Sequence, residues 1–257
     1  MEKKSKKVYL IGAGPGDPEL ITLKAIRAIE ESEAILYDHL VNPKILEHAR
    51  PDTKLIYVGK KKGHHSVPQE EINQMLVEQA NKYSCVGRLK GGDPFIFGRG
   101  GEEVEFLARH GFSIEVIPGI TSASGAGSNI LLPLTHRKYG SEVVFITGHK
   151  KKDGDYNQFT AYDLTNKTMI IYMGLTAIGS IQKELCKREN NCNLPVAIIE
   201  KATLPEERVV RGKLLSIEKL IEKEKIQAPA LIIIGEVVSF LDEIDKIKKE
   251  VAQIIHE

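Results

Sequence analysis

Residues 86–117 read VGRLKGGDPFIFGRGGEEVEFLARHGFSIEVI and hold one complete strand–loop–helix–strand unit. We predict buried strands at 86–90 and 113–117, with a helix at 102–110 between them. A helical connection between consecutive strands is typical of parallel pairing, so this stretch predicts an α/β fold. The glycine-rich loop from Gly91 to Gly101 follows a strand, at the sheet edge where ligands bind in folds of this kind.

The same alternation continues on both sides of this unit. Toward the N-terminus we predict strands at 8–12, 34–37 and 55–58, and helices at 18–29 and 69–81. After Pro133 we predict strands at 141–147, 168–172, 195–199 and 230–234, a weaker edge strand at 208–212, and helices at 178–188, 216–224 and 241–255. Residues 132–140 have turn chemistry and form the predicted linker. We therefore expect two α/β domains with mostly parallel sheets, at 1–134 and 135–257, and an active-site cleft between them.

Composition indicates an ordinary soluble globular protein, since 42% of the residues are apolar and 28% are charged. The formal net charge of +1 gives no general attraction to nucleic acid. The N-terminal residues lack the apolar stretch of a signal peptide, and no apolar run approaches the roughly 20 residues that span a bilayer. The three cysteines form no CxxC pair, which disfavours a zinc site and a disulfide framework. We expect a cytoplasmic protein that binds no metal, nucleic acid or membrane.

An earlier glycine-rich loop, at residues 12–18 (GAGPGDP), also follows a predicted strand. It lacks the lysine and the serine or threonine of a phosphate-binding P-loop, and its glycine spacing departs from the dinucleotide-binding pattern. Taken alone, it fits either a tight strand-to-helix turn or a piece of accessible backbone at the end of a strand.

The loop at 91–101 carries more chemistry. Gly91 and Gly92 leave the backbone uncovered, so a ligand can reach main-chain N–H and C=O groups. Pro94 favours an extended Asp93, whose carboxylate projects from a stiff turn. Such a carboxylate can hold an ammonium group or ribose hydroxyls.

The end of this loop is charged. Arg99 lies between two glycines, which do not shield its guanidinium. Glu102 and Glu103 open a helix, where carboxylates interact favourably with the helix dipole, and we assign that role to Glu103. Further basic residues gather at 60–65 and 136–138, also after predicted strands. This concentration indicates a positive site for a ligand with several negative charges.

Other polar residues follow predicted strands as well. Asp38 and Lys60 come after the strands at 34–37 and 55–58, so a parallel sheet would place them along the same edge as the glycine loops. Asp38 and Lys60 could equally be ordinary solvent-exposed residues with no functional role. In the loop after the strand at 113–117, Thr121 or Ser122 can cap the following helix, and the N–H groups of a helix start also bind ligand oxygens.

Seven segments of the chain together resemble the tetrapyrrole methylases. They are residues 8–17, 36–41, 58–60, 88–103, 118–122, 133–137 and 172–174, of which 88–103 is the most specific. Within that family the resemblance is to methylases that act on uroporphyrinogen III. It is to their stand-alone form, without the dehydrogenase–ferrochelatase module that is fused to them in siroheme synthases.

The resemblance implies S-adenosylmethionine as methyl donor, small-molecule substrates and a homodimer. It places ten residues against the donor: Pro15, Gly91, Gly92, Asp93, Ile96, Thr121, Ser122, Met173, Ala202 and Ala230. It gives acid–base roles to Asp38, as proton acceptor, and to Lys60, as proton donor. Arg99, Glu102 and Arg137 match positions on the substrate side, and Arg99 is an alternative to Asp38 as the catalytic group nearest the reacting ring.

The implied reaction is the methylation of uroporphyrinogen III at two carbons, giving precorrin-2 by way of precorrin-1, for siroheme, cobalamin or another tetrapyrrole. Arginines suit this substrate because it carries many carboxylates. Three alternatives remain open. One is a methylase of the same fold that acts on a later corrin precursor or on a macromolecule. The others are a nicotinamide-dependent oxidoreductase built on the first glycine loop, and a non-enzymatic protein that binds the donor without turnover.

Overall fold

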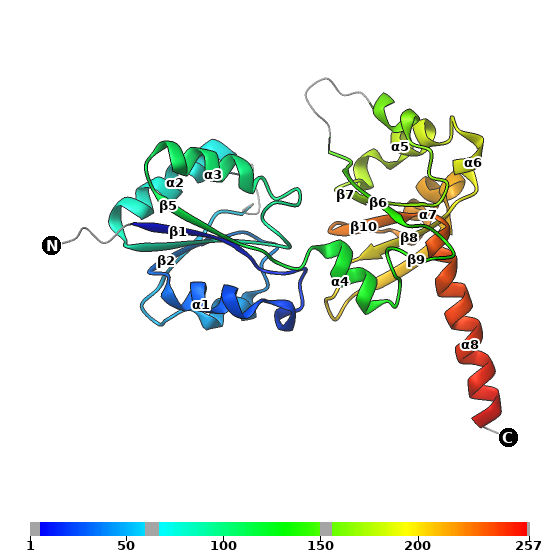
Figure 1. Cartoon of the computed structure of the whole chain (residues 1–257), viewed down its shortest axis with the longest axis horizontal. Coiled ribbons are helices and arrows are strands. Elements are labelled where there is room, and N and C mark those ends of the chain that lie inside the picture. The colour runs from blue at the N-terminus through cyan, green and yellow to red at the C-terminus, as the bar shows by residue number, and fades with distance from the viewer. Residues whose placement is uncertain (1–5, 60–66, 150–155, 256–257) are drawn as a thin grey trace. The chain divides into compact units, whose positions relative to one another are not determined.

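The computed structural model describes residues 6–59, 67–149 and 156–255 (Figure 1). The chain divides into two compact units, Met1–Gly125 and Ala126–Glu257. The sequence placed this boundary between residues 134 and 135, whereas in the structure it falls inside helix α4 (Ser122–Asn129). Residues 126–134 therefore group with the C-terminal unit. Over the described ranges, no helix is both long enough and apolar enough to cross a membrane.

The N-terminal unit is built on a five-stranded sheet in which all neighbouring strands are parallel. The strand order is β3-β2-β4-β1-β5, with β1 (Lys7–Gly12), β2 (Ala34–Tyr37), β3 (Lys54–Tyr57), β4 (Cys85–Lys90) and β5 (Ser113–Ile117). All five strands consequently end at one edge, which we call the carboxyl edge. The predicted α/β class is confirmed.

Helices cover both faces of this sheet (Figure 1). They are α1 (Leu23–Glu31) on one face, and α2 (Gln69–Lys82) and α3 (Gly100–Arg109) on the other. Side chains of β1 alternate between the two layers: Tyr9 and Ile11 pack with α1, whereas Val8 and Leu10 pack with α2 and α3. A strand covered on both faces needs apolar side chains in both directions, which explains the unbroken apolar run of β1.

The predicted helix at 18–29 is divided in the structure. Pro18–Leu20 forms a 3₁₀ turn that is capped by Asp17, whose Oδ1 accepts a hydrogen bond from Glu19 N at 2.9 Å. Helix α1 begins only at Leu23, because Oγ1 of Thr22 accepts a hydrogen bond from Ala25 N at 3.1 Å. Two successive caps thus separate what the apolar spacing alone suggests is one helix.

The C-terminal unit contains a five-stranded sheet of mixed direction. Its order is β6-β7-β10-β8-β9, with β6 (Glu142–Thr147), β7 (Lys167–Tyr172), β8 (Pro195–Glu200), β9 (Arg208–Lys213) and β10 (Ala230–Ile234). Strands β6 and β7 are parallel, whereas β10 is antiparallel to β7 and β8, and β9 is antiparallel to β8. This pairing differs from the mostly parallel pattern expected for the second domain. Residues 201–207 are too short for the crossover that a parallel β8–β9 pair would need.

Helices α5 (Ile178–Leu185), α6 (Glu189–Cys192), α7 (Ile217–Glu224) and α8 (Phe240–Ile255) complete this unit. Apolar side chains of α5 and α7, such as Ile181 and Ile217, are fully buried against the sheet. Helix α8 extends beyond the sheet in Figure 1, and its last turns are solvent-exposed.

Candidate functional site

The loops that follow β1, β4 and β5 are joined through their backbones at the carboxyl edge. Gly14 N donates to Gly92 O at 3.2 Å, and Gly92 N donates to Gly14 O at 2.6 Å. A Cβ atom on Gly12 would lie 2.4 Å from Gly119 N, and one on Gly119 would lie 2.2 Å from Gly92 O. Glycine at positions 12 and 119 therefore lets the three loops meet, because any side chain there would collide with the backbone.

Asp93 fastens two of these loops together. Its Oδ1 accepts a hydrogen bond from Phe95 N at 2.8 Å, and its Oδ2 accepts one from Gly119 N at 3.1 Å. The sequence suggested a carboxylate that projects toward a ligand, whereas in the structure both oxygens bind backbone donors. Each oxygen retains acceptor capacity for a ligand, since a carboxylate offers about four lone pairs.

The two neighbouring glycines of this loop have different roles. Gly92 has φ +68°, and a Cβ atom built on it would meet its nearest neighbour, Thr121 Cα, only at 4.0 Å. The backbone there is open, as the sequence suggested. A Cβ atom on Gly91 would lie 2.7 Å from Leu40 Cβ, so Gly91 permits close packing of the loop after β2.

The other predicted donor residues of the N-terminal unit lie on the same loops. Pro15 follows β1, Ile96 follows β4, and Thr121 and Ser122 follow β5; all four are partly buried. The carboxyl edge therefore brings together the predicted donor residues of this unit, including Asp93. Helix α4 begins at Ser122, next to Thr121, whose carbonyl accepts a hydrogen bond from Gly125 N at 3.1 Å.

Asp38 follows β2 at the same edge. Its Oδ1 accepts a hydrogen bond from Leu40 N at 3.0 Å, and its Oδ2 lies 3.4 Å from Nη2 of Arg88. The Asp38 side chain is 22% exposed, so it is within reach of a ligand. Lys60, the predicted proton donor, lies outside the described residues.

Behind Asp38 lies a buried charge cluster formed by Arg88, Lys90 and Glu103. Oε1 of Glu103 is 3.2 Å from Arg88 Nε and 3.0 Å from Lys90 Nζ. Glu103 is fully buried, although the sequence analysis gave it only a helix-start role. That assignment was incomplete: Glu103 does lie in the first turn of α3, but it also forms ion pairs with two buried cations. Burial, followed by the charge of Arg88, lowers the pKa of Lys90.

The sequence did contain a signal for this cluster. Arg88 and Lys90 are two residues apart in β4, so they share the face of the sheet that α2 and α3 cover. Buried cations require a carboxylate partner. The first buried acidic position of the following helix, Glu103, provides it.

Arg99 and Glu102 form an ion pair at the start of α3. Glu102 accepts hydrogen bonds from Arg99 Nε at 2.8 Å and from Arg99 Nη2 at 2.5 Å, and both side chains are about half exposed. The hydrogen bond from Arg99 lowers the pKa of Glu102. The two predicted substrate residues thus contact each other. Phe95 and Phe97 nearby are 57% and 37% exposed, and such apolar side chains beside an open backbone suit contact with a ligand.

In the C-terminal unit, three predicted donor residues lie at one sheet edge. Because β10 is antiparallel to β7 and β8, its first residue, Ala230, lies where those two strands end. Met173 follows β7 and Ala202 follows β8, and Lys201 N donates to Pro229 O at 2.9 Å.

The backbone at this edge is strained. Met173, Lys201 and Thr203 have φ values of +52°, +51° and +66°, which are uncommon for residues other than glycine. Strain of this kind concentrates at functional sites. Arg137 lies in the same unit, in an exposed turn closed by the hydrogen bond from His136 N to Gly140 O.

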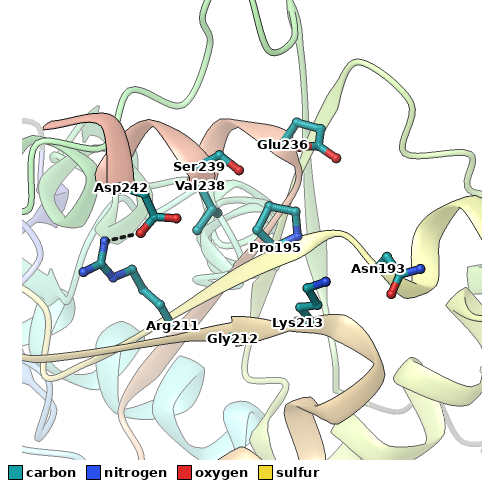
Figure 2. A pocket seen from close by; sticks show the side chains of 9 residues that line it. All are labelled: Asn193, Pro195, Arg211, Gly212, Lys213, Glu236, Val238, Ser239 and Asp242. Carbon is teal, nitrogen blue, oxygen red and sulfur yellow. Dashed lines mark hydrogen bonds and ion pairs between the residues drawn. The ribbon is translucent and has the colours of Figure 1, made fainter. Parts of the chain in front are cut away.

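A pocket of about 440 Å³ also lies in the C-terminal unit, between β9 and the start of α8 (Figure 2). Its lining includes Arg211, whose guanidinium already binds Asp242 at 3.0 Å and Asp245 at 2.6 Å. None of the residues predicted from the sequence lines it. Within the described parts of the chain, no group of three or more His, Cys, Asp or Glu side chains is arranged to hold a metal ion.

The chain is similar to several known proteins. A siroheme synthase of Pseudoalteromonas translucida is 48% identical over 93% of the chain and 50% of its own length. The chain spans about half the length of the curated relatives that it matches. A uroporphyrin-III C-methyl transferase from Thermus thermophilus, solved with S-adenyl homocysteine, is 40% identical, with a TM-score of 0.76 over 90% of this chain and 93% of that chain. A cobalt precorrin-4 methyltransferase is 26% identical, with a TM-score of 0.79 over 90% and 95% of the two chains.

A family model also matches most of the chain. Residues 7–218 match the family described as Tetrapyrrole (Corrin/Porphyrin) Methylases, and this stretch includes both sheets except β10. The joined loops at the carboxyl edge and the predicted site residues lie within it, apart from Ala230. The chain belongs to the tetrapyrrole methylase family.

Proposed function

We propose that this protein is an S-adenosylmethionine-dependent C-methyltransferase that methylates uroporphyrinogen III twice, giving precorrin-2 by way of precorrin-1. The observation that carries the proposal is the carboxyl edge of the N-terminal sheet, where the loops after β1, β4 and β5 meet at the open backbone of Gly92 and where the Asp38 carboxylate is partly exposed. Family membership and the 40% identity to a uroporphyrin-III C-methyl transferase support it.

The carboxyl edge fits a methyl donor of this kind. The open space over Gly92 allows a flat ligand to approach the main chain, and polar backbone groups at strand ends suit an amino-acid and ribose moiety. The proposed donor residues are those named from the resemblance: Pro15, Gly91, Gly92, Asp93, Ile96, Thr121, Ser122, Met173, Ala202 and Ala230. When bound, the donor supplies an electrophilic methyl group on a sulfonium centre.

The chain's own residues position the acceptor and move a proton. Arg99 and Arg137 are proposed to bind substrate carboxylates, with Glu102 orienting Arg99 through their ion pair. After the new carbon–carbon bond forms, the macrocycle must lose a proton, and Asp38 is proposed to accept it at Oδ2. Lys60 is the proposed proton donor. Most of the rate enhancement would come from alignment of the two reactants.

A homodimer is also proposed. Ile247, Val251 and Ile254 are 52%, 47% and 72% exposed and recur along α8 at spacings of four and three residues. This spacing places them on one face of the helix, as in helices that pair with another helix. A second copy of the chain is the proposed occupant of this face.

Incubation with uroporphyrinogen III and methyl-labelled S-adenosylmethionine tests the reaction. We expect two labels per tetrapyrrole and a product with the mass of precorrin-2. A product without label refutes the proposal. A methylase that acts on a later corrin precursor is the second candidate, favoured by the TM-score of 0.79 to a cobalt precorrin-4 methyltransferase. Labelling of a cobalt precorrin but not of uroporphyrinogen III would select it.

A further inference from the structure

Arg88 connects the exposed carboxylate of Asp38 to the buried interior. Its Nη2 lies 3.4 Å from Asp38 Oδ2, its Nε lies 3.2 Å from Glu103 Oε1, and its Nη1 donates to Leu89 O at 2.9 Å. The planar guanidinium has its donors in a fixed fork, so contacts on three sides define its position and plane. Only 4% of the Arg88 side chain is exposed, which leaves it no freedom to rotate into solvent.

Glu103 is the common partner within this cluster. Its Oε1 accepts from Arg88, from Lys90 and from Gln69, the last at 3.0 Å from Nε2. Gln69 also donates to Asn73 Oδ1 at 3.0 Å, so α2 is connected to the same carboxylate. Oε2 of Glu103 is buried and has no hydrogen-bond partner among the residues that the structure describes.

A buried cluster of charges is an unfavourable arrangement if its only role is to stabilise the fold. Taking charges out of water costs several kcal/mol per ion, and replacing a buried ion pair by apolar side chains is often neutral or stabilising. The cluster holds two cations, Arg88 and Lys90, and two carboxylates, Glu103 and Asp38, and only Asp38 of the four reaches solvent to a substantial extent. Of the three buried members, Arg88 contacts Asp38, the one member that faces the proposed substrate.

We propose that Glu103 is a positioning residue of the active site, which fixes Arg88 and through it the carboxylate of Asp38. The inference rests on the proposed function, in which Asp38 accepts the proton released by the macrocycle. Glu103 itself touches neither reactant. Lys90 supplies the second cation, so that the pair of Glu103 and Lys90 can be replaced together without leaving a net buried charge.

The decisive variant is Glu103→Gln combined with Lys90→Met. A single Glu103→Gln change leaves two buried cations with one carboxylate and is expected to destabilise the fold. The double variant keeps the charge balance, so we expect its melting temperature to stay near that of the wild type. The measurements are kcat and KM for uroporphyrinogen III and the Kd of S-adenosylhomocysteine.

If Glu103 positions Asp38, the double variant loses about tenfold to a hundredfold in kcat, because a displacement of about 1 Å in a reacting group has that effect. KM and the Kd of S-adenosylhomocysteine stay within about twofold of wild type, since no group that binds either reactant is changed. Arg88→Lys should lower kcat similarly, because a single ammonium cannot span Glu103 and Asp38.

The matched control is Glu105→Gln, which removes an exposed ion pair with Arg109 on the same helix and should leave kcat unchanged. A double variant that folds and keeps wild-type kcat would overturn the inference. A crystal structure of the double variant gives a readout that needs no substrate. Loss of the contact between Arg88 Nη2 and Asp38 Oδ2 supports the inference, and its retention overturns it. Failure of the wild-type protein to methylate uroporphyrinogen III would refute the proposed function instead.

Discussion

The carboxylate of Asp93 accepts a hydrogen bond from the backbone amide of Gly119, with Oδ2 and N 3.1 Å apart, and this contact joins the loop after β4 to the loop after β5. Its other oxygen accepts from Phe95 N within its own loop. One side chain thus determines both the shape of the glycine loop and its distance from the next strand end. The contact lies beside the open backbone of Gly92, where the donor is proposed to bind.

The Asp93→Asn variant should separate these two loops. Its amide nitrogen cannot accept from a backbone N–H, so one of the two contacts is lost. We expect the free energy of unfolding to fall by about 1.5–3 kcal/mol, the range for a hydrogen bond to a charged group. The Kd of S-adenosylhomocysteine should rise by about tenfold, measured by calorimetry. Asp163→Asn is the control, because Asp163 accepts from Thr165 in a similar local turn that joins no second loop. Equal donor binding in both variants would contradict the role of Asp93.

Arg99→Ala and Arg137→Ala should weaken binding of the tetrapyrrole more than binding of the donor. Each change removes a guanidinium proposed to bind a carboxylate, and we expect KM to rise by about tenfold, as for the loss of one charge-assisted hydrogen bond. The Kd of S-adenosylhomocysteine should change by less than about twofold. Arg109→Ala, which removes an exposed pair with Glu105, serves as the control. If both variants lose donor binding and keep KM, the two sides of the site have been assigned in reverse.

The contribution of Glu115 to stability should depend on pH. Hydrogen bonds from Lys24 and then Lys7 lower the pKa of Glu115 below its ordinary value of 4.5. Because the folded-state pKa is the lower one, this stabilisation is fully present above about pH 4.5 and is lost as the pH falls through the folded-state value. The hydrogen bond to Glu115 raises the pKa of Lys7 above its ordinary value of 10.5, so its share persists up to that pH. Both stabilising contributions are therefore fully present between pH 4.5 and pH 10.5.

Glu115→Gln should accordingly lower the free energy of unfolding at pH 7 by about 0.2–1 kcal/mol for each pair, the range for partly exposed ion pairs. Denaturant titrations of the variant and the wild type should converge once the pH is well below the folded-state pKa of Glu115. Glu250→Gln, in an exposed pair on α8, should show almost no difference at either pH. A difference between variant and wild type that persists in acid would contradict the electrostatic origin.

Substitution of charged residues into the apolar stripe of α8 (Ile247, Val251 and Ile254) should prevent self-association. Ile247→Lys combined with Val251→Lys places cations in an apolar stripe, which a helix partner cannot cover without burying them. We expect sedimentation velocity to show a dimer for the wild type and a monomer for the variant, with an unchanged far-UV circular dichroism spectrum. Leu215→Lys is the control, because Leu215 is 59% exposed but lies outside the stripe. A dimer that survives the double change would place the interface elsewhere.

Local sequence patterns were sufficient to predict the strands and to propose the sheet edge that carries the candidate site. The alternation of strands and helices around β1 and β4 predicts a parallel sheet, and the glycines that follow these strands predict a ligand-binding edge, without any knowledge of tertiary contacts. The same patterns could not distinguish Gly91 from Gly92. One permits packing against Leu40 and the other exposes backbone, and that difference depends on where the loop after β2 passes.

The features that local patterns do not predict depend on packing between distant parts of the sequence. In the sequence, Glu103 resembles an ordinary residue of a helix start. The spacing of Arg88 and Lys90 indicates that two cations need a carboxylate partner, but the choice of Glu103 depends on the packing of α3 over them. The position of β10 between β7 and β8 likewise brings Ala230 beside the ends of those strands. The pairing of Arg99 with Glu102 could have been predicted from the sequence, because the two residues are three positions apart at a helix start.

The position of β1 in the order β3-β2-β4-β1-β5 means that this strand waits for its partners while the chain is being synthesised. β1 is synthesised before the other strands, yet it pairs with β4 and β5, so that Lys7 meets Cys85 and Ser113. Both edges of this apolar strand remain unpaired until most of the N-terminal unit has been translated. Pairing at such sequence separation is slow to form, and an exposed strand edge invites association with other chains. The strand that contributes the first loop of the candidate site is therefore exposed to association with other chains for much of the synthesis of the N-terminal unit.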